Sequence, residues 1–241
     1  MILSFILPKA YRDYRIFKSY GPGGVPYNVF GWLIVRCIFC SFGREVFSTS
    51  EYDWRIAAGE SQSFLTLTEE QLHARKADGR PVVGPHPVPQ RQLTQIPDET
   101  VKQKIREEFA AFASRNKHLV QTKLSKLEKH TDALFVADSL PWSRLAKQMN
   151  GEIAHIHGQK DHSVHAILPP ADCKILIDSG WAQRHPFSGT RARTYLSLGT
   201  ENDIPSEFIL LYAPRNEVEV GIIMQIIAAS VRYMTDRVDL L

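Results

Sequence analysis

Two short strand-like runs joined by a turn constrain the fold of this chain more than any other feature. Ile153–His157 and Ser163–Leu168 both contain β-branched residues, and Gly158–His162 between them is mostly polar and begins with glycine. This arrangement predicts an antiparallel β-hairpin. The sheet of the fold is therefore expected to include residues 153–168.

The predicted hairpin gathers histidines on one face. Alternate side chains of a strand share a face, and so do directly opposite residues of an antiparallel pair. With a turn at residues 158–162, His155 faces His165 and His157 faces Ser163, which leaves His162 in the turn with a weaker role. A slip of one residue would move His165 to the other face. Five of the nine histidines lie between residues 151 and 186: His155, His157, His162, His165 and His185.

Helices and further strands are predicted around the hairpin. Pro169–Ser179 has the prolines of a helix start and is followed by glycine, whereas Trp181–His185 and Phe208–Tyr212 are strand-like. Asn216 caps a last helix whose apolar residues keep helical spacing to about Thr235. We therefore expect an α+β fold, with a small mixed or antiparallel sheet, helices packed on one face and a mostly helical N-terminal region before it.

The region before the hairpin is predicted to contain more helix than strand. Ile96–Lys117 has apolar residues at helical spacing, and Leu119–Leu127 and Pro141–Asn150 are expected to form short helices. Ala133–Ala137 is expected to be a strand. The proline-rich stretch Gly79–Gln90 predicts an extended connector.

The most apolar stretch is Tyr27–Phe42, which follows a predicted helix from Pro8 to Tyr20. As a helix it would be about 24 Å long, shorter than the ~30 Å hydrocarbon core of a bilayer. Arg36 near its middle also disfavours a full span. Two interpretations stay open, a buried helix or an in-plane membrane anchor. We divide the chain into an N-terminal apolar, membrane-facing segment (1–45) and one α+β domain (46–241) with a motif-rich core (151–236).

Charge and cysteine content narrow the functional classes. The 29 basic residues are interleaved with 26 acidic ones, for a net charge of +3, so no basic stripe for nucleic acid is formed. The three cysteines, Cys37, Cys40 and Cys173, do not form a disulfide framework. We expect an intracellular protein that associates with membrane through its N-terminal apolar helices.

Three interpretations fit the histidines. His155, His157 and His165 could hold Zn or Fe, with Asp161 or Glu152 as a further ligand. Alternatively, one imidazole is a base in metal-free acid–base catalysis, and a cation stabilises the resulting enolate. In the third interpretation the histidines only fill polar positions on the sheet. Their number within so short a stretch favours a chemical role.

Four ordered motifs resemble the fungal luciferase family. They are GEIAHIHGQKDHSVH, GWAQRHPFSG, FILLYAPRNEVEV and ASVRYMTD, in this order from Gly151 to Asp236. The family carries an H-x-H…H segment, a G-W-x-x-R-H-P segment and a Y-A-P-R-[ND]-E segment in the same order. AYRDYRIFKSYGP before the apolar stretch resembles the family more loosely. Lys160 stands where we would expect a further histidine in luminous members, so a non-luminous member is expected.

The resemblance implies an oxygenase-like activity on a hydroxylated α-pyrone, with molecular oxygen and without a known metal or flavin. Such a reaction needs a base, cations that hold the anion, and a dry pocket. The matching motifs imply five catalytic residues: His155, His157, His165, Arg184 and His185. The implied substrate-binding residues are Trp181, Tyr212, Arg215 and Tyr195, the last on the polar loop Phe187–Ser206, which is long enough to be a lid.

We therefore expect a cofactor-independent enzyme of oxygenase type acting on a small apolar oxygenated metabolite such as a pyrone or polyketide. Three alternatives stay open. The first is a cofactor-free cyclase or pericyclase of a secondary-metabolite pathway. The second is a metal-dependent hydrolase or lyase that uses the histidines, and the third is a non-catalytic, membrane-associated metabolite-binding protein.

Overall fold

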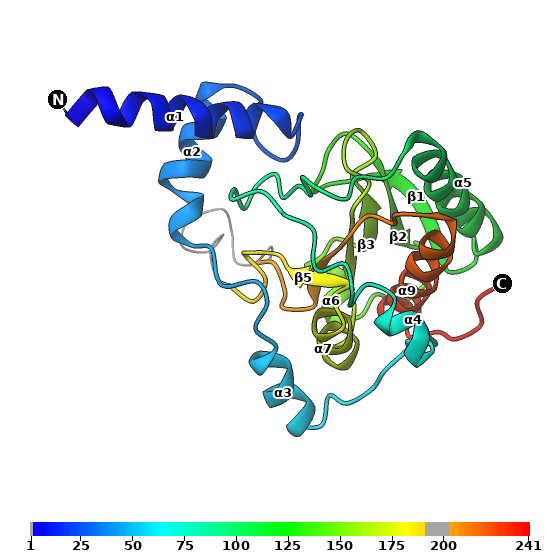
Figure 1. Cartoon of the computed structure of the whole chain (residues 1–241). Coiled ribbons are helices and arrows are strands. Elements are labelled where there is room, and N and C mark those ends of the chain that lie inside the picture. The colour runs from blue at the N-terminus through cyan, green and yellow to red at the C-terminus, as the bar shows by residue number, and fades with distance from the viewer. Residues whose placement is uncertain (1, 191–202) are drawn as a thin grey trace.

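A six-stranded antiparallel sheet forms the centre of the structure, a computed structural model that describes residues 2–190 and 203–241 (Figure 1). The strands lie in the order β1-β2-β3-β4-β6-β5, so β6 separates β5 from the hairpin. The expected α+β class is confirmed. The strands are β1 (Val120–Leu124), β2 (Asp132–Val136), β3 (Glu152–Ile156), β4 (Val164–Ile167), β5 (Ala182–Arg184) and β6 (Phe208–Leu211).

Helices α5 and α9 lie together against the sheet, α9 in contact with β2, β3 and β4 and α5 with β1 (Figure 1). Helix α7 connects β4 to β5 and packs against α3. The helical elements are α1 (Ile2–Ser19), α2 (Val29–Cys37), the 3-10 helix η1 (Phe39–Ser41), α3 (Ser50–Ala57), α4 (Glu69–His73), α5 (Glu99–Arg115), α6 (Arg144–Gln148), α7 (Pro170–Asp178) and α9 (Glu217–Thr235).

The last helix forms as its sequence predicts. The side chain of Asn216 accepts a hydrogen bond from the backbone N–H of Glu219 at 3.0 Å, which caps the start of α9. Its isoleucines Ile222, Ile223, Ile226 and Ile227 are buried in the main core. Within the described residues α9 alone is long and apolar enough to cross a membrane, but 61% of that apolar window is buried inside the protein.

The hairpin has the predicted register. His155 pairs with His165, and the backbone N–H of His157 donates to the carbonyl of Ser163 at 2.9 Å. Ala154 and Ile156 of β3 belong to the main core, so the histidines that alternate with them point to the opposite face. Residues 158–162 make the turn, and His162 adopts a positive φ of 59° there.

The prediction of a helix at Leu119–Leu127 was wrong, because this segment contains the edge strand β1. Val120–Leu124 pairs residue by residue with Asp132–Val136. Val120 is buried, but Leu124 is 60% exposed, as expected for an edge strand whose end leaves the core. The apolar spacing of this segment suits either structure, and the backbone hydrogen bonds to β2 select the strand.

The N-terminal helices form a small core of their own around Phe17, Tyr20 and Val35. Helix α1 starts before the predicted position and contains Pro8 within it. The interpretation of Tyr27–Phe42 as a buried helix was wrong, because only Gly31 and Val35 of α2 are buried. Six large hydrophobic side chains of this stretch are at least 37% exposed: Tyr27, Val29, Phe30, Leu33, Ile34 and Ile38.

The packing of α9 leads to a stability prediction. We expect Ile226→Ala to lower the free energy of unfolding by about 2–5 kcal/mol, because it leaves a cavity between α9 and the sheet. The control is Val218→Ala on the same helix, where the side chain is 74% exposed and a change within about 0.5 kcal/mol is expected. Urea unfolding measures both, and equal effects of the two substitutions would contradict the described packing.

Candidate functional site

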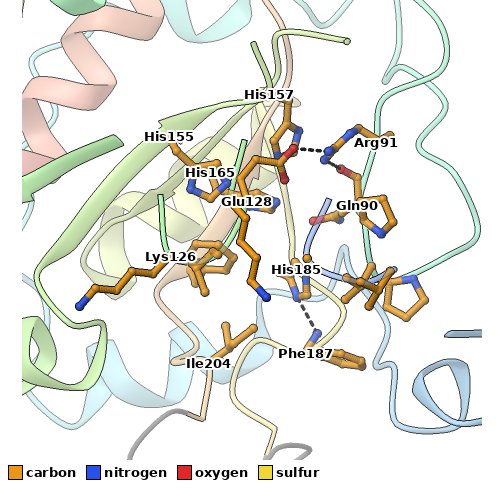
Figure 2. Close-up of a pocket in the computed structure, with 18 of the residues that line it drawn as sticks. Gln90, Arg91, Lys126, Glu128, His155, His157, His165, His185, Phe187 and Ile204 are labelled. Carbon is orange, nitrogen blue, oxygen red and sulfur yellow. Dashed lines mark hydrogen bonds and ion pairs between the residues drawn. The ribbon is translucent and has the colours of Figure 1, made fainter. Parts of the chain in front are cut away.

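Three buried histidines converge at the floor of a pocket (Figure 2). His155 and His157 come from β3 and the residue after it, and His165 comes from β4. One ring nitrogen of each lies within 4.8 Å of a ring nitrogen of each of the other two. We call these three residues the histidine trio. The sequence predicted this grouping, and the structure confirms that the three side chains lie together.

Each histidine of the trio is oriented by a hydrogen bond at Nδ1. For His155 the partner is the Glu152 carboxylate at 2.8 Å, and for His165 it is the backbone carbonyl of Ile209 at 3.1 Å. For His157 it is the hydroxyl of Ser163 at 2.9 Å. A carbonyl or carboxylate oxygen only accepts, so Nδ1 of His155 and of His165 carries the hydrogen. The lone pair of the neutral imidazole is then at Nε2.

His157 has the same tautomer. The hydroxyl of Ser163 donates to Oδ1 of Asp161 at 3.0 Å, which leaves its oxygen to accept from Nδ1–H of His157. Asp161 also accepts from the backbone N–H of Gln92, which ties the hairpin turn to the segment after the proline-rich connector. All three members of the trio therefore have Nε2 as the nitrogen with a free lone pair.

Burial favours the neutral form of two members of the trio, His157 and His165. It lowers the pKa of His157 and of His165 well below the usual value, because the charged form would lose its hydration. The positive charge of Arg91 lowers the pKa of His157 further, and the neighbouring imidazoles lower that of His165. Burial also raises the pKa of Glu152, but the hydrogen bonds from His155 and Ser125 outweigh it and lower the pKa overall.

His185 joins the cluster but has a different role in the structure. Its ring lies 5.4 Å from that of His165, although β6 separates their strands. Nδ1 of His185 accepts from the backbone N–H of Phe187 at 3.0 Å, and the ring also hydrogen-bonds to the backbone of Pro87. Burial lowers its pKa to about 3. Both ring nitrogens are engaged, so His185 fastens the connector to the sheet; its predicted catalytic role is not tested.

The pocket above the trio has a volume of about 230 Å³ and mostly apolar walls. The pocket is closed over the sheet by four segments: the connector, η1, the loop after β1 and the segment around Phe187. The apolar lining includes Val25, Phe39, Val88, Leu127, Phe187 and Phe208. Phe208 stacks on the ring of His165 with centroids 4.5 Å apart. Such a site suits a small, largely apolar molecule whose polar end faces the trio.

An ion pair between Arg91 and Glu128 also lines the pocket (Figure 2). Both side chains are buried, and sequence analysis missed them. Burial raises the pKa of Glu128, against the opposing effect of Arg91. A buried carboxyl group with a raised pKa in a pocket is suited to proton transfer. Nothing local in the sequence distinguishes Glu128, whereas Arg91 at the end of the proline-rich connector could have been noticed.

Arg184 does not line this pocket. Its guanidinium donates to Glu51 at 2.7 Å and to the carbonyl of Ser188 at 3.0 Å, and it lies over the ring of Tyr52. Consecutive residues at the end of β5 point to opposite faces, so Arg184 and His185 cannot enter the same pocket directly. The buried cation beside the trio is Arg91, from a different part of the chain.

The predicted substrate-binding residues lie elsewhere. Trp181 is fully buried under the guanidinium of Arg75, and its indole N–H donates to the carbonyls of Gln71 and Leu72 at 3.1 Å. Tyr212 donates to the side chain of Gln183 at 3.2 Å. None of Trp181, Tyr212 and Arg215 lines the pocket, and Tyr195 lies outside the described residues.

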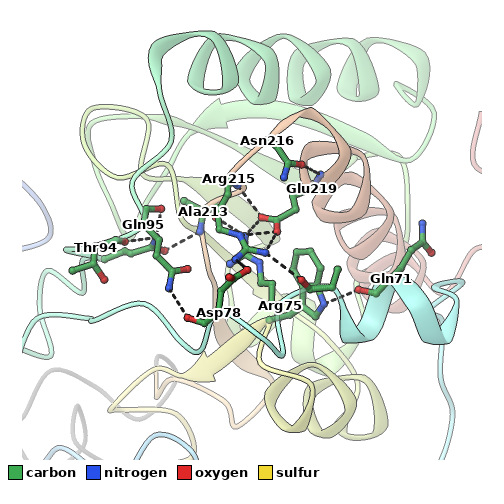
Figure 3. Close-up of polar contacts among 12 residues, drawn as sticks. Gln71, Arg75, Asp78, Thr94, Gln95, Ala213, Arg215, Asn216 and Glu219 are labelled. Carbon is green, nitrogen blue, oxygen red and sulfur yellow. Dashed lines mark hydrogen bonds and ion pairs between the residues drawn. The ribbon is translucent and has the colours of Figure 1, made fainter.

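Arg215 belongs to a charged network that is buried at Arg75 and Glu219 and exposed at Asp78 (Figure 3). Its Nε donates to Glu219 at 2.8 Å, and its Nη1 donates to Asp78 at 2.5 Å. Glu219 also pairs with Arg75, whose side chain is almost fully buried. The network joins α4 and the segment after it to the start of α9, so the contacts of Arg215 are structural.

An α+β domain built around this trio corresponds to a described family. The profile described as "Luciferase domain" matches residues 150–230, which include β3, β4 and the trio. The chain is 34% identical to the luciferase of Armillaria mellea, over 95% of this chain and 83% of that protein. It is 31% identical to the luciferase of Neonothopanus nambi, over 93% of this chain and 81% of that protein. The chain therefore belongs to the fungal luciferase family, which confirms the resemblance. No solved structure matches it.

The network in Figure 3 leads to a second stability prediction. We expect Glu219→Gln to lower the free energy of unfolding by about 3–5 kcal/mol at pH 7, because Arg75 would lose its buried charge partner. Glu217→Gln, at an exposed position of the same helix, is the control and should cost less than about 1 kcal/mol.

The same substitution has a defined pH dependence. Burial raises the pKa of Glu219, but Arg215 and Arg75 outweigh it and lower the pKa overall. A carboxyl group whose pKa is lower in the folded protein stabilises above its unfolded pKa, about 4.3, and this contribution disappears as the pH falls through the folded pKa. The difference between wild type and Glu219→Gln should therefore shrink in acid. A constant difference from pH 7 to pH 3 in urea unfolding would contradict this assignment.

Proposed function

We propose that this member of the luciferase family is an oxygenase-type enzyme acting on a small, apolar, oxygenated metabolite such as a pyrone or polyketide. The observation that carries the proposal is the pocket, in which an apolar wall faces three imidazoles, each held by a hydrogen bond at Nδ1. The relatives named as luciferases support an enzyme over a binding protein.

The proposed reaction begins with loss of a proton from a hydroxyl group of the substrate. The resulting enolate is electron-rich and can transfer electrons to molecular oxygen, which is the co-substrate. The pocket offers two kinds of proton acceptor, an Nε2 atom of the trio and the carboxyl group of Glu128. Arg91 supplies the positive charge that stabilises the anion, and the apolar walls exclude water from it.

A cofactor-free cyclase is the second candidate function, because the same pocket could hold and deprotonate a substrate that then rearranges. Oxygen consumption during turnover separates the two. Each turnover of the oxygenase consumes oxygen, whereas the cyclase works equally well in anaerobic buffer. Oxygen uptake is also a better measurement than light, since a non-luminous reaction is expected from Lys160.

We expect His165→Ala to reduce turnover of a hydroxylated pyrone by at least about 100-fold, in the range found when acid–base groups are removed. The reason is that the substitution removes one imidazole of the trio, together with the stacking of that imidazole on Phe208. His73→Ala is the matched control, because His73 is exposed on α4. An oxygen electrode measures the rate, and circular dichroism checks the fold. Near-full activity of folded His165→Ala would rule out the assigned site.

We also propose that the N-terminal segment binds the membrane surface and delivers the apolar substrate. Helix α2 has exposed apolar residues, and helix α1, which contacts it, has exposed basic residues such as Lys9 and Arg12; this combination suits an in-plane anchor. Phe39 of η1, directly after α2, lines the pocket. A substrate dissolved in lipid would then reach the pocket along this segment.

Flotation with phosphatidylcholine vesicles tests this proposal. The wild-type chain is expected to float with the vesicles, and Phe30→Glu combined with Leu33→Glu should remove most of the floated protein by placing charges on the apolar face of α2. Trp54→Glu is the control, because Trp54 is 79% exposed on α3, outside this face. Equal flotation of all three proteins would contradict binding through α2.

A further inference from the structure

Each member of the trio has one ring nitrogen held by a hydrogen bond and a second nitrogen without a described partner. Each Nδ1–H is held by an oxygen atom, from Glu152, Ser163 and Ile209 respectively. Metal-binding histidines almost always show this pattern, in which one ring N–H donates to a carboxylate, carbonyl or similar acceptor and the other nitrogen binds the ion. No hydrogen-bond donor among the described residues reaches the remaining nitrogen of any member of the trio.

The spacing of the nitrogens is close to that of a metal site. With Zn–N bonds of about 2.0–2.1 Å, two ligands of a tetrahedral ion lie about 3.3 Å apart. The ligand atoms of the trio all lie within 4.8 Å of one another. The rings must move closer for all three nitrogens to reach ligand distance, whereas the strands that carry the trio are fixed by the paired register of His155 and His165.

The buried charges around the trio also suit a cation. Glu152 contacts His155, and Asp161 lies 3.3 Å from His157, so two ligands have a carboxylate behind them. Glu128 adds a third buried carboxylate, and Arg91 pairs with it. When these groups are ionised, the buried charges beside the trio are negative overall, which favours a cation. His185 contributes no ligand, because both of its nitrogens are engaged.

We propose that His155, His157 and His165 form a binding site for a divalent transition metal of the Zn²⁺ or Fe²⁺ class, with an open coordination position toward the pocket. Imidazole ligands favour these ions over Mg²⁺ or Ca²⁺. The sequence favoured a metal-free site, and the convergent, oriented trio is the reason to prefer the alternative. The site stands independently of the reaction. One consequence rests on the proposed function: ligated imidazoles cannot accept a proton, so Glu128 becomes the proton acceptor.

The test uses the full chain without a polyhistidine tag, stripped with a chelator and titrated with Zn²⁺ or Co²⁺. We expect about one ion per chain by elemental analysis and the visible absorption of Co²⁺ in a low-symmetry site. His165→Ala should weaken binding by at least about 100-fold, since it removes a ligand. Glu152→Gln keeps all three ligands and should weaken metal binding about 10–100-fold. If His165→Ala does not fold, the metal affinity of Glu152→Gln tests the proposed site in its place.

Two further variants are the controls for the metal site. His185→Ala changes a histidine of the same cluster that is not a ligand, so its metal content should equal that of the wild type. Glu128→Gln should also keep the metal but lose most of its turnover, and the turnover that remains should have a changed pH dependence of kcat. Failure of the wild-type chain to bind either ion, or an equal loss of metal in His165→Ala and His185→Ala, would overturn the proposal. Full oxygen uptake by metal-free protein would show that turnover does not need the metal, and would overturn the role of Glu128 as the proton acceptor in its place. Metal binding without oxygen uptake would keep the metal site and reject the oxygenase.

Discussion

The pairing of β3 with β4 is the interaction on which the rest of this structure depends. Its register places His155 opposite His165 and, at the same time, directs Ala154, Ile156, Val164 and Ala166 into the core. These two outcomes are inseparable, because side chains alternate between the faces of a strand. A slip of one residue would turn the histidines toward α9 and the core residues toward the pocket, so both sets would lose the contacts that suit them. The apolar core thus fixes the geometry of the polar site.

The opposite face of the sheet is closed by segments that come from far away in the sequence. His185 fastens the proline-rich connector to the end of β5, and Asp161 fastens the segment directly after the connector to the hairpin turn. This closure places Arg91 and Glu128 beside the trio. Polar groups at the border of the pocket therefore have two roles. Their contacts hold the closing segments in place and exclude water, and their charges act more strongly because the pocket is dry.

The sequence was most informative where local pattern and tertiary packing agree. The cap at Asn216 and the isoleucine stripe predicted α9, and the strand-like runs around the turn predicted the hairpin, because each element has one face against the core. Prediction failed at Leu119–Leu127, where strand β1 lies at the edge of the sheet and is selected by its partner β2. It also failed for α2, whose apolar side chains are exposed.

The sequence by itself determined the family, the α+β class and the face shared by the trio, because these follow from ordered motifs and from the period of a strand. Only the tertiary structure decided which charged groups reach the pocket. It places Arg184 with Glu51 and Arg215 with Glu219, and it brings Arg91 and Glu128 to the trio. The physical reason is that buried charges are positioned by partners distant in the chain, and local spacing does not specify such partners.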